Sequence, residues 1–175
     1  EKIEMVLEVG IDITERKRAE LAEKEHYELA TALANIASML SKTLKIDDVM
    51  HRILENVERV VPHDAANIQL IDDDIAQIIA CRGYEKQGID PSAILATSFP
   101  LFKSSILTGI RSSREPHIIA NTTYNEAWIH GPENQWVRAF LAAPILVEGE
   151  TLGFIALDSA TPNFFTSEHA SPLKS

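Results

Sequence analysis

The chain has 175 residues, of which 45% are hydrophobic and 24% charged, a composition typical of a globular protein. Its formal net charge of -10 argues against a nucleic-acid-binding surface, because such a surface needs a basic patch. The single cysteine, Cys81, excludes a disulfide within the chain and fits a reducing compartment, so we expect a cytoplasmic location. No apolar run is long enough to span a membrane and no signal peptide is visible, so no membrane contact is expected.

The first predicted element is a strand at residues 1–13. Apolar residues alternate with other residues here, the pattern of a half-buried strand; they are Met5, Leu7, Val9, Ile11 and Ile13. Since the chain starts within this pattern, we interpret it as a piece of a longer protein.

A helix is predicted next, over residues 14–44, which contain neither glycine nor proline. Its apolar or small residues recur at steps of three and four, the spacing of a coiled-coil seam. The seam residues are Ala22, His26, Leu29, Leu33, Ile36 and Leu40. Residues 14–28 carry too little apolar surface for a core helix, so we expect a connector that pairs two copies of the chain. For Leu29 to Leu44, an amphipathic helix packed on its own domain is equally compatible.

A second helix is predicted from Asp47, which can cap it, to Val61, just before Pro62. Its broad apolar stripe indicates a helix that faces a core. A hairpin follows, with strands at residues 65–71 and 75–81. The three aspartates at 72–74 form its turn, and their spacing does not match a calcium loop.

The middle of the chain is predicted to be irregular, with short elements. Residues 82–98 are loop-like, 99–102 and 116–120 are short strands, and 104–113 form a helix. Residues 121–135 are polar, with Trp128 inside the stretch and Trp136 beside it. These tryptophans either form a lid over a pocket or anchor the loop to the sheet. A second hairpin follows, with strands at 140–147 and 151–158 and a turn that contains Gly149.

This last hairpin resembles the GAF domain, which pairs a strand of small residue, proline and aliphatics with a strand that begins Leu-Gly. Here these are Ala143-Pro144-Ile145 and Leu152-Gly153-Phe154. Upstream, the order of a leading helix, a hairpin and an Arg114-Glu115-Pro116 segment also fits, as does Phe165-Thr166-Ser167-Glu168 at the start of a last helix. The resemblance covers residues 27–170.

The resemblance implies an α+β fold: an antiparallel sheet of about six strands flanked by helices, with a long N-terminal helix. It also implies that the first and last helices cover one face and that a ligand pocket lies under loops on the other. The pocket candidates, placed by the order of the elements, are Tyr84, Phe102, His117, Asn121, Trp128, Trp136 and Phe140.

The N-terminal segment resembles the end of a PAS sensor domain and the signalling helix that leaves it. The motif is Asp12-Ile13-Thr14 at the end of a strand, followed by a charged helix. The resemblance divides the chain into a last PAS-like strand at 1–13, a connector at 14–44 and the GAF-like domain.

The C-terminal end departs from the GAF pattern, because Pro172 is a poor residue for continuing a helix. We therefore expect the last helix to be truncated or absent. The apolar stripe of Ile53, Val57 and Val61 would then lack part of its usual cover, and we predict that a second copy of the chain supplies some of it.

No catalytic or metal-binding constellation is found in the sequence. Cys81 has no resolving partner and is expected to be a small buried hydrophobe. Bilin-binding GAF domains carry a Cys-His pair, which this sequence lacks, so no covalent bilin is expected. The identity of the cofactor is unknown, and a noncovalent small ligand, haem included, stays open.

The sequence thus predicts a regulatory sensor segment of a multidomain signal-transduction protein, whose output domain, a histidine kinase or a cyclic-dinucleotide enzyme, lies outside this chain. The GAF-like domain would bind a small ligand, mediate homodimerisation, or do both, and the connecting helix would pass the signal. The segment itself is not expected to be an enzyme. The alternatives are a ligand-free dimerisation module and a thiol-dependent redox enzyme that uses Cys81.

Overall fold

The computed structural model of the chain describes residues 46–174. The expected PAS-like strand at 1–13 and connecting helix at 14–44 lie outside the described residues. So do the seam residues of that helix, Ala22, His26, Leu29, Leu33, Ile36 and Leu40.

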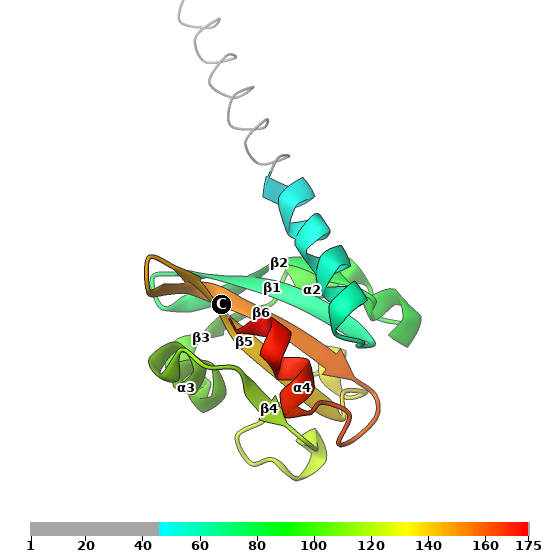
Figure 1. Cartoon of the computed structure of the whole chain (residues 1–175). Coiled ribbons are helices and arrows are strands. Elements are labelled where there is room, and N and C mark those ends of the chain that lie inside the picture. The colour runs from blue at the N-terminus through cyan, green and yellow to red at the C-terminus, as the bar shows by residue number, and fades with distance from the viewer. Residues whose placement is uncertain (1–45, 175) are drawn as a thin grey trace, which may run out of the picture. The chain divides into compact units, whose positions relative to one another are not determined.

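One antiparallel sheet of six strands organises the described part of the chain, in the order β3-β2-β1-β6-β5-β4 (Figure 1). The strands are β1 (Ala65–Asp72), β2 (Ile75–Arg82), β3 (Ser98–Pro100), β4 (His117–Ile119), β5 (Ala139–Val147) and β6 (Glu150–Ser159). The first and second hairpins come together because β1 pairs with β6, Ala66 lying opposite Leu157. This confirms the predicted α+β fold and the sheet of about six strands.

Both predicted hairpins are present, and each closes through two residues with positive φ. In the first, Asp73 and Asp74 have φ of 43° and 64°; in the second, Glu148 and Gly149 have φ of 52° and 84°. Positive φ at both central residues is the geometry that matches the right-handed twist of paired strands. Asp and Gly tolerate positive φ readily, which fits Asp73, Asp74 and Gly149.

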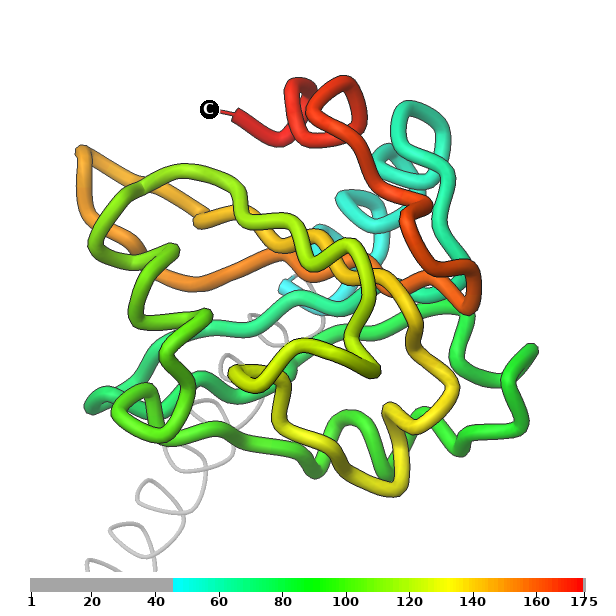
Figure 2. The backbone as a smooth tube through the Cα atoms, turned by 90° about the horizontal axis from the view of Figure 1, so that it is seen from below, coloured from blue at the N-terminus to red at the C-terminus, as the bar shows by residue number. Residues whose placement is uncertain are grey.

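One face of the sheet is covered by the helix at residues 46–60 and by the C-terminal segment (Figure 2). Leu54 of that helix and Val61 just after it are fully buried there, against strand residues such as Ile68 and Leu157. The expectation that Ile53, Val57 and Val61 lack cover therefore needs correction: the sheet buries Val61 and part of Val57, and only Ile53 is exposed.

The C-terminal segment on this face is short. The helix α4 (Ser167–Ala170) begins where the sequence predicts, and a 3-10 turn at Ser171–Leu173 follows it directly. Pro172 fits because it occupies the first turn of that 3-10 segment, where no backbone N–H is required. Ala170 and Leu173 are buried, so even this short segment contributes to the core.

The other face is covered by the helix α3 (Ser105–Ser113) and by loops. Ile106, Leu107 and Ile110 of α3 pack against Phe140 and Phe154 of the sheet. Ser104 caps the helix: its Oγ accepts a hydrogen bond from the N–H of Leu107 at 3.2 Å.

The segment between β2 and β3, predicted to be a loop, contains two short helices. Tyr84–Gln87 form a 3-10 turn, and Pro91–Leu95 form α2, which Asp90 caps at the N–H of Ser92. The Asp90-Pro91 pair is a helix-start signal, but a five-residue helix has no apolar periodicity by which to recognise it. The predicted strand at 99–102 is also shorter than expected, because a 3-10 turn begins at Leu101.

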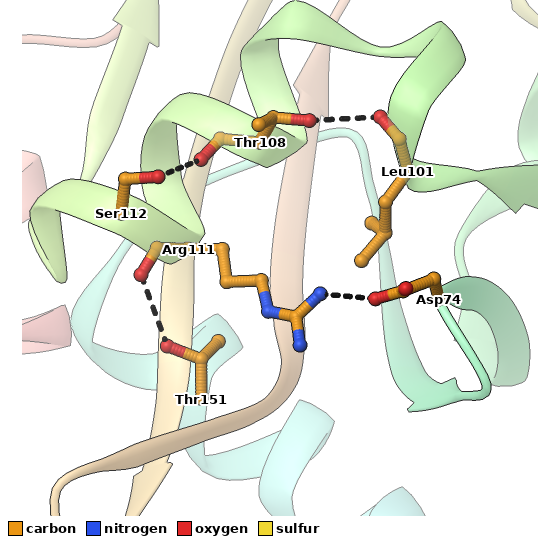
Figure 3. A network of polar contacts seen from close by, with 6 residues as sticks. All are labelled: Asp74, Leu101, Thr108, Arg111, Ser112 and Thr151. Carbon is orange, nitrogen blue, oxygen red and sulfur yellow. Dashed lines mark hydrogen bonds and ion pairs between the residues drawn. The ribbon is translucent and has the colours of Figure 1, made fainter.

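A network of polar contacts anchors α3 to its neighbours (Figure 3). The Thr108 hydroxyl donates to the carbonyl oxygen of Leu101 at 2.8 Å, and Ser112 donates to the carbonyl oxygen of Thr108 at 2.9 Å. Arg111 forms an ion pair with Asp74 in the first hairpin turn, while its carbonyl oxygen accepts from Thr151 on β6. These contacts place α3 over the sheet as one wall of the space described below.

None of the helices within residues 46–174 combines the length and the apolar character needed to cross a lipid bilayer.

Candidate functional site

Two adjoining cavities lie between the sheet and the loops that cover its second face. Their volumes are about 140 and 70 Å³. The two linings share six residues: Gln69, Phe99, Trp128, Ile129, Asn134 and Phe140. Wider hollows of about 640 and 720 Å³ also occur beside α3, but mostly exposed side chains line them, which is the character of open surface. The two inner cavities are therefore the candidate site.

Four buried polar side chains form a chain of hydrogen bonds along the wall of the larger cavity. Gln69 donates through Nε2 to Oδ1 of Asn67 at 2.9 Å, and Asn67 donates through Nδ2 to the Tyr84 hydroxyl at 2.7 Å. The Tyr84 hydroxyl in turn donates to Oδ2 of Asp158 at 2.6 Å. Each of the four residues is at most 5% exposed. We call these residues the relay; every donor in it is directed toward the carboxylate.

Strand geometry explains why the relay residues meet. Asn67 and Gln69 are two positions apart on β1, so their side chains share a face of the sheet. Asp158 comes from the neighbouring β6, where it pairs with Ala65. Tyr84 reaches the same face from the 3-10 turn that follows β2. The relay ends at Asp158.

Burial raises the pKa of the Asp158 carboxyl to about 7, although the hydrogen bond from Tyr84 acts in the opposite direction. Burial also raises the pKa of the Tyr84 phenol, and the neighbouring Asp158 carboxylate raises it further. The site therefore holds an acid that changes its charge near neutral pH, whereas the phenol stays protonated.

Two buried polar atoms of residues that line the cavities have no hydrogen-bond partner in the described part of the chain: Oε1 of Gln69 and Nε1 of Trp128. An unpaired buried polar group costs about 1–3 kcal/mol, so native proteins keep few of them. Both residues line both cavities.

The polar stretch at residues 121–138 forms the outer wall, and its two tryptophans differ in role. Trp128 lines the cavities and packs edge to face on Phe140, with ring centroids 4.9 Å apart. Trp136 packs on the edge of Tyr84 at 6.1 Å and donates through Nε1 to the carbonyl oxygen of Glu133 at 3.0 Å. The sequence left two hypotheses for these tryptophans, a lid over a pocket or an anchor of the loop. The contacts of Trp128 fit the lid, and those of Trp136 fit the anchor.

The structure brings together three of the seven residues predicted to line a pocket, Tyr84, Trp128 and Phe140. Trp136 packs on Tyr84 but is absent from the lining of the larger cavity. Three others lie elsewhere. Phe102 is 82% exposed beside a surface hollow, His117 is exposed on β4, and the Asn121 side chain caps a short turn at the N–H of Thr123.

Sequence reasoning missed the other relay residues, Asn67, Gln69 and Asp158. Polar residues at alternate positions of a strand normally indicate a face exposed to water. The pattern therefore did not identify Asn67 and Gln69 as buried site residues. An aspartate at the end of the otherwise apolar strand β6 was the available signal.

Cys81 lies outside both cavity linings and is partly buried, with its thiol 3.8 Å from the carbonyl oxygen of Pro91. Burial, and secondarily Glu85, raises the pKa of the thiol to about 11. Because the thiolate is the reactive form, this environment makes Cys81 a weak nucleophile near neutral pH.

Within residues 46–174, no group of three or more histidine, cysteine or acidic side chains is arranged to hold a metal ion.

Solved structures share this fold at low sequence identity. The GAF domain/HD domain protein from Geobacter sulfurreducens aligns with a TM-score of 0.62 and 15% identity, over 75% of this chain and 87% of that one. A type II free methionine-R-sulfoxide reductase from Thermoplasma acidophilum aligns with a TM-score of 0.60 and 13% identity, over 75% and 86%. A methyl-accepting chemotaxis protein aligns with a TM-score of 0.58 and 20% identity, over 77% and 87%.

Sequence comparison identifies the family directly. No curated protein matches the chain. A family model described as a GAF domain matches residues 43–175, which is most of the chain and includes every element of the sheet and both cavities. The chain therefore belongs to the GAF domain family.

Proposed function

We propose that this chain is a regulatory sensor segment of a signal-transduction protein, and that its GAF domain binds a small ligand in the two adjoining cavities. The observation that carries the proposal is the pairing of an apolar cavity with a buried polar wall in which one donor and one acceptor are unmatched. A core built only for stability would pair or omit these groups.

Known relatives of the fold give additional support. A chemotaxis protein and a GAF domain/HD domain protein are among the structures that share it. The catalytic output of the parent, of the histidine kinase or cyclic-dinucleotide type, would be carried by a domain beyond this sequence, in the cytoplasm. Ligand binding would bias the population of helix arrangements that the output domain reads.

We also propose that the segment acts as a homodimer through its N-terminal helical region. Support comes from the described helix at residues 46–60, where four large apolar side chains are exposed. They are Ile46, Val49, Ile53 and Val60. Their steps of three, four and seven residues put them on one stripe of the helix.

 The exposed fractions are 50% for Ile46, 50% for Val49, 38% for Ile53 and 59% for Val60. An exposed apolar stripe of this kind is typical of a surface that contacts a partner.

Two alternatives remain distinct from this proposal. In the first, the domain is a ligand-free dimerisation module whose cavities hold no specific molecule. In the second, it is a thiol-dependent redox enzyme, a class suggested by the reductase that shares the fold. The raised pKa of Cys81 disfavours the second alternative, because little thiolate is available. Replacing Cys81 by serine and assaying methionine sulfoxide reduction tests it: a thiol-dependent activity that disappears in the variant would establish the enzyme.

The experiment that tests the sensor proposal is native mass spectrometry of the chain purified from cells, beside a denatured sample. We expect an extra mass that is lost on denaturation, carried by a species of twice the chain mass. A spectrum with whole multiples of the bare chain, together with no binding in a subsequent ligand screen, would favour the dimerisation module. A bare monomer at high concentration would refute the homodimer.

A further inference from the structure

The unmatched atoms in the cavity wall specify more than the presence of a ligand. Oε1 of Gln69 is a hydrogen-bond acceptor and Nε1 of Trp128 is a donor, and both are buried without a partner among residues 46–174. A molecule that pairs with both must itself offer a donor and an acceptor, because each pairing removes the penalty of an unmatched buried group.

The relay determines which end of the Gln69 amide is left unpaired. The ionised carboxylate of Asp158 can only accept, so the Tyr84 hydroxyl must donate to it. Tyr84 then accepts from the amide nitrogen of Asn67, whose oxygen accepts from the amide nitrogen of Gln69. The carbonyl oxygen of Gln69 is thus left for the ligand, and it requires an N–H or O–H group.

Trp128 requires the complementary group. An indole nitrogen can only donate, so its partner must be an acceptor such as a carbonyl oxygen.

The charges around the cavities argue for an uncharged ligand. Among residues 46–174, no lysine, arginine or histidine lines either cavity, whereas Glu133 and Asp158 line the larger one. An anion would lose its hydration without gaining a counter-charge. A cation that can only donate would leave the Trp128 nitrogen unmatched.

Size and shape narrow the class further. The larger cavity, at about 140 Å³, is close to the engineered cavity of about 150 Å³ that binds benzene in another protein. The rings of Phe99, Trp128 and Phe140 line it, which suits a flat apolar body.

From these observations we propose that the cavities bind a small, uncharged, planar molecule whose edge carries a donor beside an acceptor, as in a carboxamide. The donor pairs with Oε1 of Gln69 and the acceptor with Nε1 of Trp128. This inference rests on the proposed ligand-binding function and specifies the chemistry of that ligand.

The test uses four probes that share one ring: benzamide, benzoate, benzamidinium and toluene. Their affinities for the full chain are measured by titration calorimetry at pH 8, above the pKa of about 7 of Asp158, so that the carboxylate is ionised. Benzamide offers both groups, benzoate only acceptors, benzamidinium only donors, and toluene neither. We expect benzamide to bind at least ten-fold more tightly than each of the other three.

Two variants assign the contacts. Trp128→Phe removes the indole N–H and keeps an aromatic ring, and Gln69→Leu removes the amide. Trp128→Phe should weaken benzamide binding about ten-fold but leave the binding of aniline, which offers no strong acceptor, unchanged within about two-fold. Gln69→Leu should weaken both ligands. Thermal melts of the apo variants identify a variant that fails to fold. In that case the four-probe comparison on the unmodified chain tests the inferred ligand chemistry by itself.

The outcomes separate this inference from the proposed function. If benzoate, benzamidinium or toluene binds as tightly as benzamide, the cavities bind ligands and the inferred chemistry is wrong. If none of the four probes binds, both the inferred chemistry and the proposal that these cavities are the ligand site are overturned.

Discussion

The hydroxyl of Tyr84 donates a hydrogen bond of 2.6 Å to the carboxylate of Asp158, a residue 74 positions further along the chain. Both side chains are buried, at 3% and 5% exposure. The contact links the turn after β2 to the end of β6, on the face of the sheet that holds the cavities. This hydrogen bond thus belongs both to the polar wall of the site and to the contacts that stabilise the sheet.

Asp158 should make the stability of the domain depend on pH. Its pKa is about 7 in the folded chain and 3.8 for an ordinary aspartate, so the unfolded state releases the proton first as pH rises. The free energy of unfolding should therefore fall between about pH 4 and pH 7, with about 2 kcal/mol lost from pH 5.5 to pH 8. Urea unfolding at these two pH values measures the loss.

The control is Asp158→Asn, which keeps the shape of the side chain and cannot ionise. Other titrating groups act in both proteins, so the difference between their pH profiles isolates Asp158. Equal slopes for the two proteins would show that the carboxyl does not hold a raised pKa.

Removing the Tyr84 hydroxyl should destabilise the domain, because Asp158 and Asn67 each lose a partner. We expect Tyr84→Phe to lower the free energy of unfolding by about 2 kcal/mol. The pKa of Asp158 should also rise further, since the hydrogen bond from Tyr84 holds it down. Tyr124→Phe is the matched control: Tyr124 is 84% exposed, and the change should stay within about 0.5 kcal/mol. A loss for Tyr84→Phe as small as that of the control would contradict the role of the relay.

The sheet could be predicted from the sequence because its signals are local. Alternating apolar residues and short turns, one of three aspartates and one containing Gly149, identify both hairpins. The predicted strands at 65–71 and 151–158 lie within β1 and β6. The pairing of β1 with β6 was not predicted, because it joins residues far apart in the chain and leaves no local signal. The helix α2 was missed because five residues are too few to show a period.

The site was less predictable for a physical reason. Side-chain alternation tells which residues of a strand share a face, but it does not tell whether loops cover that face. Asn67 and Gln69 therefore resemble solvent-facing positions, while Trp128 and Phe140 are recognisable by their bulk and apolar character. Phe102 shows the opposite error, because an aromatic residue near the site turned out to be 82% exposed.

Gly153 should be essential where β6 passes β1. A Cβ atom there would lie 2.1 Å from the backbone oxygen of Gln69, and strand backbones cannot move apart without breaking their pairing. We expect Gly153→Ala to cost at least about 2 kcal/mol of unfolding free energy in urea titrations. Gly109→Ala, within α3 and with nothing within 4 Å of the added atom, should stabilise the domain by about 0.5–1 kcal/mol. A stable Gly153→Ala protein would mean that the two strands can separate more easily than their close contact indicates.

The exposed stripe on the helix at residues 46–60 should control the proposed dimerisation. Ile53 lies near the middle of this stripe and is 38% exposed, so Ile53→Glu would place a charge in a paired apolar surface while leaving the buried core intact. We expect the dimer dissociation constant, measured by analytical ultracentrifugation, to rise at least ten-fold while the far-UV circular dichroism stays the same. Arg59→Glu introduces the same side chain at an exposed position off the stripe and should change the constant by less than about three-fold. If both variants weaken the dimer equally, net charge is responsible; if neither does, the copies pair through another surface.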